Sequence, residues 1–146
     1  QVLKRLNVSN KVYNRITALV RWHQSVADVD NIKLGDWFVL LNPSLTLDLL
    51  DVRVADLKAH NPEKIATELE KLLKIREKAV QMIDKGTPWR VSDLKINGSD
   101  LKKIGCNGRE IGKILDKLLL LAANEKIENI NSVLLEYAVN IKSAGD

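Results

Sequence analysis

The chain of 146 residues is long enough for one domain or two small helical subdomains, and its 45% hydrophobic content suffices for a core. Seven Gly and three Pro are few, while Leu, Lys, Ile, Glu and Ala are frequent, which predicts an all-α protein. The longest apolar block, residues 114–123, is interrupted by Asp116 and Lys117, which argues against a membrane span. A single cysteine, Cys106, cannot form an intrachain disulfide, so we expect a cytoplasmic protein.

The first predicted helix follows Ser9, a suitable N-cap, and ends near Gln24. Its apolar positions recur at helical spacing; they are Val12, Ile16, Leu19, Val20 and His23. A shorter apolar helix is predicted over 32–41, stopped by Asn42 and Pro43.

Two longer helices follow. Ser44 is predicted to cap a buried helix over 45–60, and Asn61 with Pro62 forms a cap and first-turn pair for the next. That helix extends to Gly86, a suitable terminating residue. Its predicted inner stripe is Ile65, Leu69, Leu72, Leu73, Arg76, Ala79, Val80 and Ile83.

We place a subdomain boundary after Gly86, where Thr-Pro-Trp breaks the helical pattern. Ser92 and Asp93 are predicted to cap a single turn. Asn97 with Gly98 forms a tight turn, and Ser99 caps a short helix that ends at Ile104.

The C-terminal part of the chain is predicted to contain two more helices, over 109–124 and 131–142. The turn from Gly105 to Gly108 reverses the chain before the first of them. Gly112 inside that helix costs on the order of 1 kcal/mol relative to Ala, so close packing or the close approach of a ligand would explain it.

Positive charge is concentrated in two segments of this chain, whose net charge is +4. Residues 1–27 contain five bases and no acid, and residues 95–117 contain six bases against three acids. Such patches attract polyanions, and phosphate contacts would make binding salt-dependent. Lys and Arg on helix faces also commonly serve only to solvate a surface.

The turn between Gly105 and Gly108 has two interpretations. A helix that begins near Arg109 directs unpaired N–H groups and a positive dipole end toward this turn, which is typical of a phosphate site. The basic side chains around it are Lys102, Lys103, Arg109 and Lys113. In the structural alternative, Gly105 ends the preceding helix and Gly108 permits the turn.

Catalytic motifs are not apparent in the sequence. His23 and His60 stand 37 residues apart, outside any metal-ligand spacing, and His23 fits a core or boundary position. Three carboxylates, Asp48, Asp51 and Asp56, do not share one helix face, so we interpret them as ordinary helix residues. Trp22, Trp37 and Trp89 could stack on bases, although core filling is the more frequent role at such positions.

Three phrases, in order along the chain, resemble the bacterial tRNA nucleotidyltransferases, which include the CCA-adding enzymes and their poly(A) polymerase relatives of the HD type. They are LKRLNVSNKVYNRITALVRWHQ, LLDVRVADLKAHNPEK and SDLKINGSDLKKIGCNGREIGKIL. Asp56 matches the closing aspartate of the HD site, and His23 matches an accessory histidine. Where the family often has Pro-Gly-Pro, this chain has Asn107, Gly108 and Arg109, which predicts a looser and more basic turn.

The resemblance implies the C-terminal portion of a template-independent nucleotidyltransferase that binds tRNA, with a helical body over 1–86 and a helical RNA-binding subdomain over 87–146. The opening on Gln1 inside a helical pattern also suggests a longer parent protein. Catalysis would then require an N-terminal head that binds Mg²⁺ and CTP or ATP, and we expect no catalytic residue, metal ligand or cofactor in this chain. The RNA-contacting residues that we expect are Lys95, Asn97, Lys102, Lys103, Asn107, Gly108, Arg109 and Lys113.

Two other classes of function remain open at this point. The remnant of an HD-type phosphohydrolase would show metal-dependent activity on small phosphate esters. A structural protein-interaction module would show no RNA affinity. Whether the parent adds CCA, CC, A or poly(A) would be decided in the head.

Overall fold

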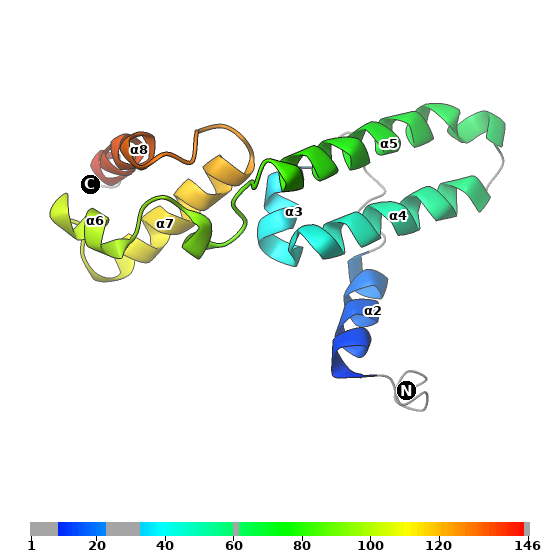
Figure 1. The fold of residues 1–146 in the computed structure, drawn as a ribbon, viewed down its shortest axis with the longest axis horizontal. Coiled ribbons are helices and arrows are strands. Elements are labelled where there is room, and N and C mark those ends of the chain that lie inside the picture. The colour runs from blue at the N-terminus through cyan, green and yellow to red at the C-terminus, as the bar shows by residue number, and fades with distance from the viewer. Residues whose placement is uncertain (1–8, 23–32, 60–61, 145–146) are drawn as a thin grey trace. The chain divides into compact units, whose positions relative to one another are not determined.

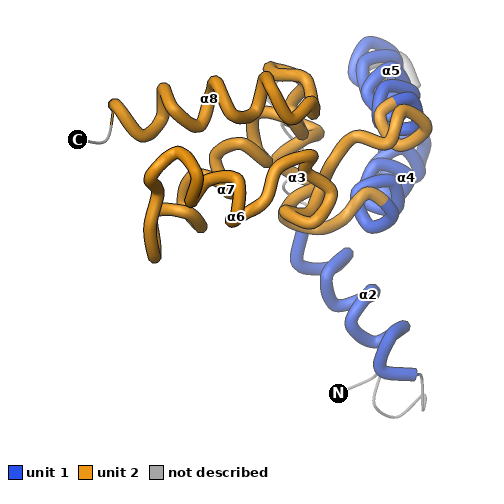
Figure 2. The backbone as a smooth tube through the Cα atoms, turned by 60° about the vertical axis from the view of Figure 1, so that its left-hand side comes forward, with its two compact units in different colours: residues 1–32, 44–81 blue, residues 33–43, 82–146 orange. Residues whose placement is uncertain are grey.

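The computed structural model describes residues 9–22, 33–59 and 62–144. Within these ranges it contains seven α-helices, one short 3₁₀ helix and no strand, which confirms the predicted all-α class (Figure 1). The chain divides into two compact units, residues 1–32 with 44–81 and residues 33–43 with 82–146 (Figure 2). The predicted division of this chain into subdomains, 1–86 and 87–146, stays a prediction.

Helix α2 (Asn10–Trp22) confirms the first predicted helix and its cap. The backbone N–H of Val12 donates to Ser9 Oγ at 3.4 Å. None of the residues of α2 is buried, and Val12 and Val20 are 43% and 65% exposed. The predicted apolar stripe is therefore only partly covered: Ile16 and Leu19 are half-buried, whereas Val12 and Val20 are exposed. His23 lies outside the described residues.

Helices α4 (Pro43–Ala59) and α5 (Pro62–Asp84) lie side by side (Figures 1 and 2) and supply most of the first unit. Leu50, Val54 and Leu57 of α4 are buried, as their spacing predicts. On α5, Leu72 and Ala79 are fully buried, whereas Leu73, assigned to the same stripe, is 44% exposed. Ion pairs also join the two helices: Arg53–Glu68 at 2.5 Å and Arg76–Asp51.

The predicted ends of these helices are partly confirmed. Helix α3 (Leu34–Leu41) stops at Asn42, as predicted, and Gly86 ends α5 with its N–H bonded to Ile83 O at 2.9 Å. The prediction that Ser44 caps α4 is wrong: the helix begins at Pro43, whose fixed φ suits the first helical position. The predicted cap Asn61 lies outside the described residues.

Helix α7 (Gly108–Ala123) is the centre of the second unit. It packs against α3, α6 (Gly98–Lys103), α8 (Asn131–Ser143) and the 3₁₀ helix η3 (Val91–Asp93). Leu101, Leu118 and Leu134, from α6, α7 and α8, are fully buried in the shared core. The helices predicted over 109–124 and 131–142 are thus confirmed to within about one residue at each end.

Gly35 permits an unusually close approach between α3 and α7. An added Cβ at this position would lie 2.5 Å from the carbonyl carbon and oxygen of Ala123, a distance that real Cβ atoms essentially never show. Beside this contact, Asn124 Nδ2 donates to Asp36 Oδ1 at 2.7 Å. These contacts explain why α3 groups with residues 82–146 despite its distance in sequence.

Two of the predicted caps in the second unit are wrong. Ser92 lies inside η3, and Asp93 alone forms the cap: its Oδ2 accepts from the N–H groups of Arg90 at 2.9 Å and Trp89 at 3.2 Å. Asn97, not Ser99, caps α6, because its extended backbone (φ −138°, ψ 176°) brings its side chain over the first turn. Asn is at least as good an N-cap as Ser, so the upstream residue takes the role.

None of the helices in the described ranges is long and apolar enough to cross a membrane.

Candidate nucleic-acid interface

The α6–α7 bend, residues 104–107, joins the two helices that contain most of the predicted RNA-contacting residues. Gly105 has φ 83°, and its N–H donates to Lys102 O at 3.0 Å, while the N–H of Cys106 donates to Leu101 O at 3.0 Å. This pair of bonds is the Schellman pattern that ends a helix. The structural interpretation of Gly105 therefore holds, and the buried Cys106 anchors the bend to the core.

The start of α7 forms the other side of the bend. The N–H of Asn107 donates to Glu110 Oε2 at 3.2 Å. The N–H groups of Gly108 and Arg109 have no partner among the described residues, as is usual at a helix N-terminus. Gly105 and Gly108 are both exposed, and a Cβ at Gly108 would have no atom within 4 Å. The bend is thus open to solvent, with backbone donors on its α7 side.

Asn97 and Asp100 form reciprocal hydrogen bonds at the start of α6. Asn97 Oδ1 accepts from the N–H groups of Ser99 at 2.8 Å and Asp100 at 3.2 Å, and Asp100 Oδ2 accepts from the N–H of Asn97 at 3.2 Å. Asp100 Oδ1 also accepts from Lys103 Nζ at 3.0 Å. The bond from the Lys103 ammonium, and then that from the Asn97 amide, lowers the pKa of the Asp100 carboxyl from its ordinary value. Two predicted contact residues, Asn97 and Lys103, are therefore also part of a local capping network.

The other predicted cations near the bend have a different environment. The side chains of Lys102, Arg109 and Lys113 are exposed and have no carboxylate partner among the described residues. Three arginines of the first unit, in contrast, are paired: Arg15 with Asp48, Arg53 with Asp56 and Glu68, and Arg76 with Asp51. Lys102, Arg109 and Lys113 thus place uncompensated positive charge around the bend.

Lys113 also borders a hollow of about 300 Å³ between α7 and α8. The apolar side chains of Ile114 and Ile141 line it together with those of Glu110, Lys117 and Lys142. Three ammonium groups and one carboxylate give this hollow a net positive charge.

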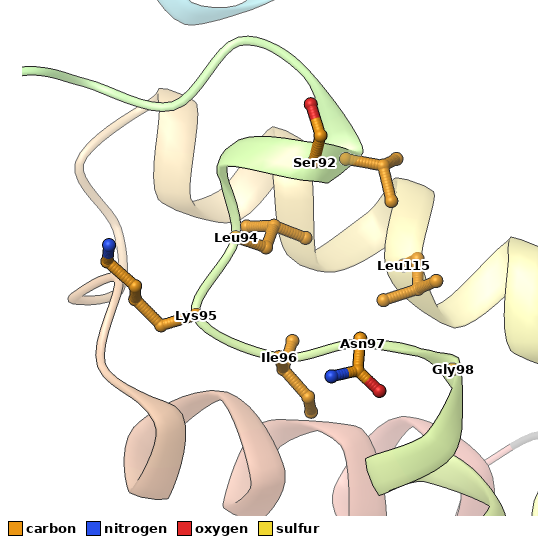
Figure 3. A pocket seen from close by; sticks show the side chains of 8 residues that line it. Ser92, Leu94, Lys95, Ile96, Asn97, Gly98 and Leu115 are labelled. Carbon is orange, nitrogen blue, oxygen red and sulfur yellow. The ribbon is translucent and has the colours of Figure 1, made fainter.

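Lys95 lies on a neighbouring part of the second unit, where its backbone is fixed by two asparagines. Its N–H donates to Asn129 Oδ1 and its carbonyl accepts from Asn131 Nδ2, both at 2.9 Å. A second hollow, of about 350 Å³, lies here with Leu94, Ile96 and Leu115 among its lining residues (Figure 3). The Lys95 side chain points away from Leu115 in this view. Lys95 is thus exposed at the rim of an apolar hollow.

Lys142 of α8 is a functional candidate that sequence reasoning missed. Its Nζ donates to the carbonyl oxygens of Ile104 at 3.1 Å and Gly105 at 3.0 Å. A lysine in the last turn of a helix can bond free carbonyls, but the usual expectation concerns carbonyls of its own helix. The bonds here span 37 and 38 residues, so no local signal in the sequence indicates them.

The aromatic candidates are less exposed than the cations. Trp89 is half-buried, and the Arg90 guanidinium lies 3.7 Å from the centroid of its ring. This stack covers part of the indole surface that a base would use.

Carboxylates and histidines do not form a metal site within the described ranges: no group of three or more His, Cys, Asp or Glu side chains there could hold an ion. Asp48, Asp51 and Asp56 each form an ion pair with an arginine instead. His23 and His60 lie outside the described residues.

These observations define an all-α protein with an open, basic bend between two helices. A family model described as tRNA nucleotidyltransferase domain 2 matches residues 1–138, so the chain belongs to that family. Neither the curated proteins nor the solved structures include a significant match to this chain.

Proposed function

We propose that this chain is the tRNA-docking part of a tRNA nucleotidyltransferase that adds CCA to tRNA 3′ ends. The nucleotidyl transfer itself would take place in an N-terminal head of the parent protein, outside this chain, with Mg²⁺ and CTP or ATP. Family membership over residues 1–138 supports the first part of this proposal. CCA addition rests on the resemblance of the three sequence phrases.

The observation that carries the docking role is the environment of the cations. Lys102, Arg109 and Lys113 are exposed and have no carboxylate partner among the described residues, and they flank a bend with free amide donors. A cation that is already paired must give up its partner before it can bind a phosphate, whereas an unpaired one exchanges only solvent and counterions.

The chemistry of this surface suits folded RNA. A-form helices are recognised through phosphates and 2′-hydroxyls, because their deep major groove does not admit side chains. Helix N-termini and Lys or Arg side chains supply such contacts without reading bases. The proposed role is therefore to hold the folded body of a tRNA by its backbone, with Asn107 and Gly108 at the bend itself and Lys95 at the margin of the same surface.

The test is the simultaneous change Lys102→Ala, Lys103→Ala and Arg109→Ala. Each lost phosphate contact lowers the salt slope by about 1, so the variant should bind tRNA about tenfold or more weakly at low salt and with a flatter salt dependence. Fluorescence anisotropy of labelled tRNA at several salt concentrations measures both quantities. Wild-type affinity in the variant at low salt would remove the docking role.

A matched control removes three positive charges elsewhere. Lys71, Lys74 and Lys78 are exposed on α5, so their joint change to Ala removes the same charge from another surface. We expect this control to retain most of the tRNA affinity and the slope of the wild type. An equal loss in both variants would indicate attraction by net charge alone.

A further inference from the structure

The bond between Lys142 and the α6–α7 bend has a feature that helix packing alone does not require. The carbonyls of Ile104 and Gly105 follow the last residue of α6, where no helical N–H remains to satisfy them. The Lys142 ammonium donates to both, at 3.1 and 3.0 Å, from the last turn of α8. The C-terminal helix thus holds the bend by its carbonyl side and leaves its α7 side open.

Gly105 and Lys142 also fit each other sterically. A Cβ at Gly105 would lie 3.0 Å from Lys142 Nζ, tighter than nine in ten real Cβ contacts, so a side chain at this position would need the ammonium to shift. The aliphatic stem of Lys142 lies half-buried beside Ile141 and the α7–α8 hollow. Its ammonium therefore has little freedom to leave the carbonyls.

We propose that Lys142 is a positioning residue for the RNA surface: by fixing the α6–α7 bend, it sets the arrangement of Lys102, Arg109 and the free amides at the start of α7. This role rests on the tRNA docking proposed above. Backbone donors that are fixed before binding lose less conformational freedom when they grip a phosphate, which raises affinity without a new contact. Lys142 acts through the bend and does not itself contact the RNA.

The first measurement is made on the free protein. Lys142→Met keeps a linear apolar stem and removes the three donors. Amide hydrogen exchange should become faster at Gly105 and Cys106, whose N–H groups close the bend, and remain unchanged at Ser99 and Asp100, which the Asn97 cap protects. Unchanged exchange at the bend would overturn the positioning role.

The second measurement is a double-mutant cycle on tRNA affinity. We expect Lys142→Met to weaken tRNA binding by about tenfold in the wild type. The loss should be no more than about threefold when Lys102 and Arg109 are already Ala, because the effects of substitutions on affinity are not additive when one residue acts through the others. Lys117→Met is the matched control. Lys117 lines the same hollow and has no bond to the bend carbonyls, so its effect should be the same in both backgrounds. A tenfold loss for Lys142→Met in both backgrounds would identify a direct phosphate contact and overturn the proposal.

The two proposals fail in different ways. A wild-type protein that does not bind tRNA contradicts the docking function, and with it the proposed purpose of Lys142. Tight tRNA binding that Lys142→Met leaves intact contradicts the positioning role alone.

Should Lys142→Met fail to fold, Lys142→Arg provides a second variant, because its guanidinium keeps donors for the two carbonyls at a different distance from the backbone. Intermediate exchange at Cys106 with intermediate affinity then supports the proposal, and wild-type exchange with reduced affinity overturns it.

Discussion

At the scale of a single residue, the Asp100 carboxylate has two roles: it completes the cap of α6 and it pairs with a cation of the proposed RNA surface. It accepts from the backbone of Asn97, which completes the cap, and from the ammonium of Lys103, which is 76% exposed. A surface pair of this kind contributes little to stability, so Lys103 can leave Asp100 for a stronger anion. The predicted contact role of Lys103 therefore remains a prediction.

The titration of Asp100 gives a testable consequence. Its folded-state pKa is lowered, first by the bond from Lys103 and then by that from the Asn97 amide. The cap therefore contributes its full stabilisation above the unfolded-state pKa of about 3.9 and loses it as pH falls through the lower folded-state value. An NMR titration of the Asp100 carboxyl carbon should place its midpoint below about 3.9.

Lys103→Met is the informative comparison for this titration, because it removes the larger cause and leaves the Asn97 amide in place. Its Asp100 midpoint should move up toward the ordinary value. A wild-type midpoint at or above about 3.9 would show that the capping bonds are not maintained in solution.

At the scale of elements, a buried glycine at the α3–α7 contact and an exposed glycine of α7 have opposite roles. Gly35 of α3 is buried against the backbone of Ala123, whereas Gly112 of α7 is exposed and has no atom near the position of its missing Cβ. Close packing within the described residues therefore does not explain Gly112. Of the two reasons that the sequence suggested for it, the close approach of a ligand remains a prediction.

The two glycines predict opposite changes in stability. Gly35→Ala should destabilise the protein by about 1–3 kcal/mol, because α3 must shift away from α7. Gly112→Ala should stabilise it by about 0.5–1 kcal/mol, because Ala favours the helix interior. Urea unfolding followed by circular dichroism measures both. Equal effects would mean that the α3–α7 contact does not form as described.

Helix ends were the least predictable feature at this scale. Helix positions followed from apolar spacing, and the αL glycines Gly86 and Gly105 fell at the predicted ends. The caps of α4 and α6 were misassigned to Ser44 and Ser99, because α4 already begins at Pro43 and the side chain of Asn97 caps α6. Several residues near a helix start can serve as caps, and sequence alone ranks them only weakly.

At the scale of the whole molecule, the pairing of each cation with a carboxylate matters more for binding a polyanion than the net charge does. The net charge of +4 is modest; Arg15, Arg53 and Arg76 of the first unit are paired with carboxylates, whereas Lys102, Arg109 and Lys113 around the α6–α7 bend are not. The N-terminal basic segment predicted from the sequence includes Arg15, which is paired with Asp48, and Lys11 and Arg21, which are exposed; its residues 1–8 lie outside the described ranges. The residues that make up the proposed RNA surface all belong to the second unit.

This distribution predicts the salt dependence of tRNA binding by the intact chain. If about four cations each displace a counterion, affinity should fall by about a hundredfold between about 50 and 200 mM salt. A filter-binding or anisotropy series over this range measures the slope. A slope near zero would be inconsistent with docking through phosphates.

The sequence by itself determined the helical class, the approximate helices and the family phrases, because apolar spacing, capping residues and glycine positions are properties of short stretches of chain. It also indicated which segment is basic. The tertiary structure decided which of those cations are compensated, that α3 packs against α7 through Gly35, and that Lys142 reaches the carbonyls of the bend. Each of these depends on residues that are distant in sequence and become neighbours only when the helices pack, so no local pattern could have indicated them.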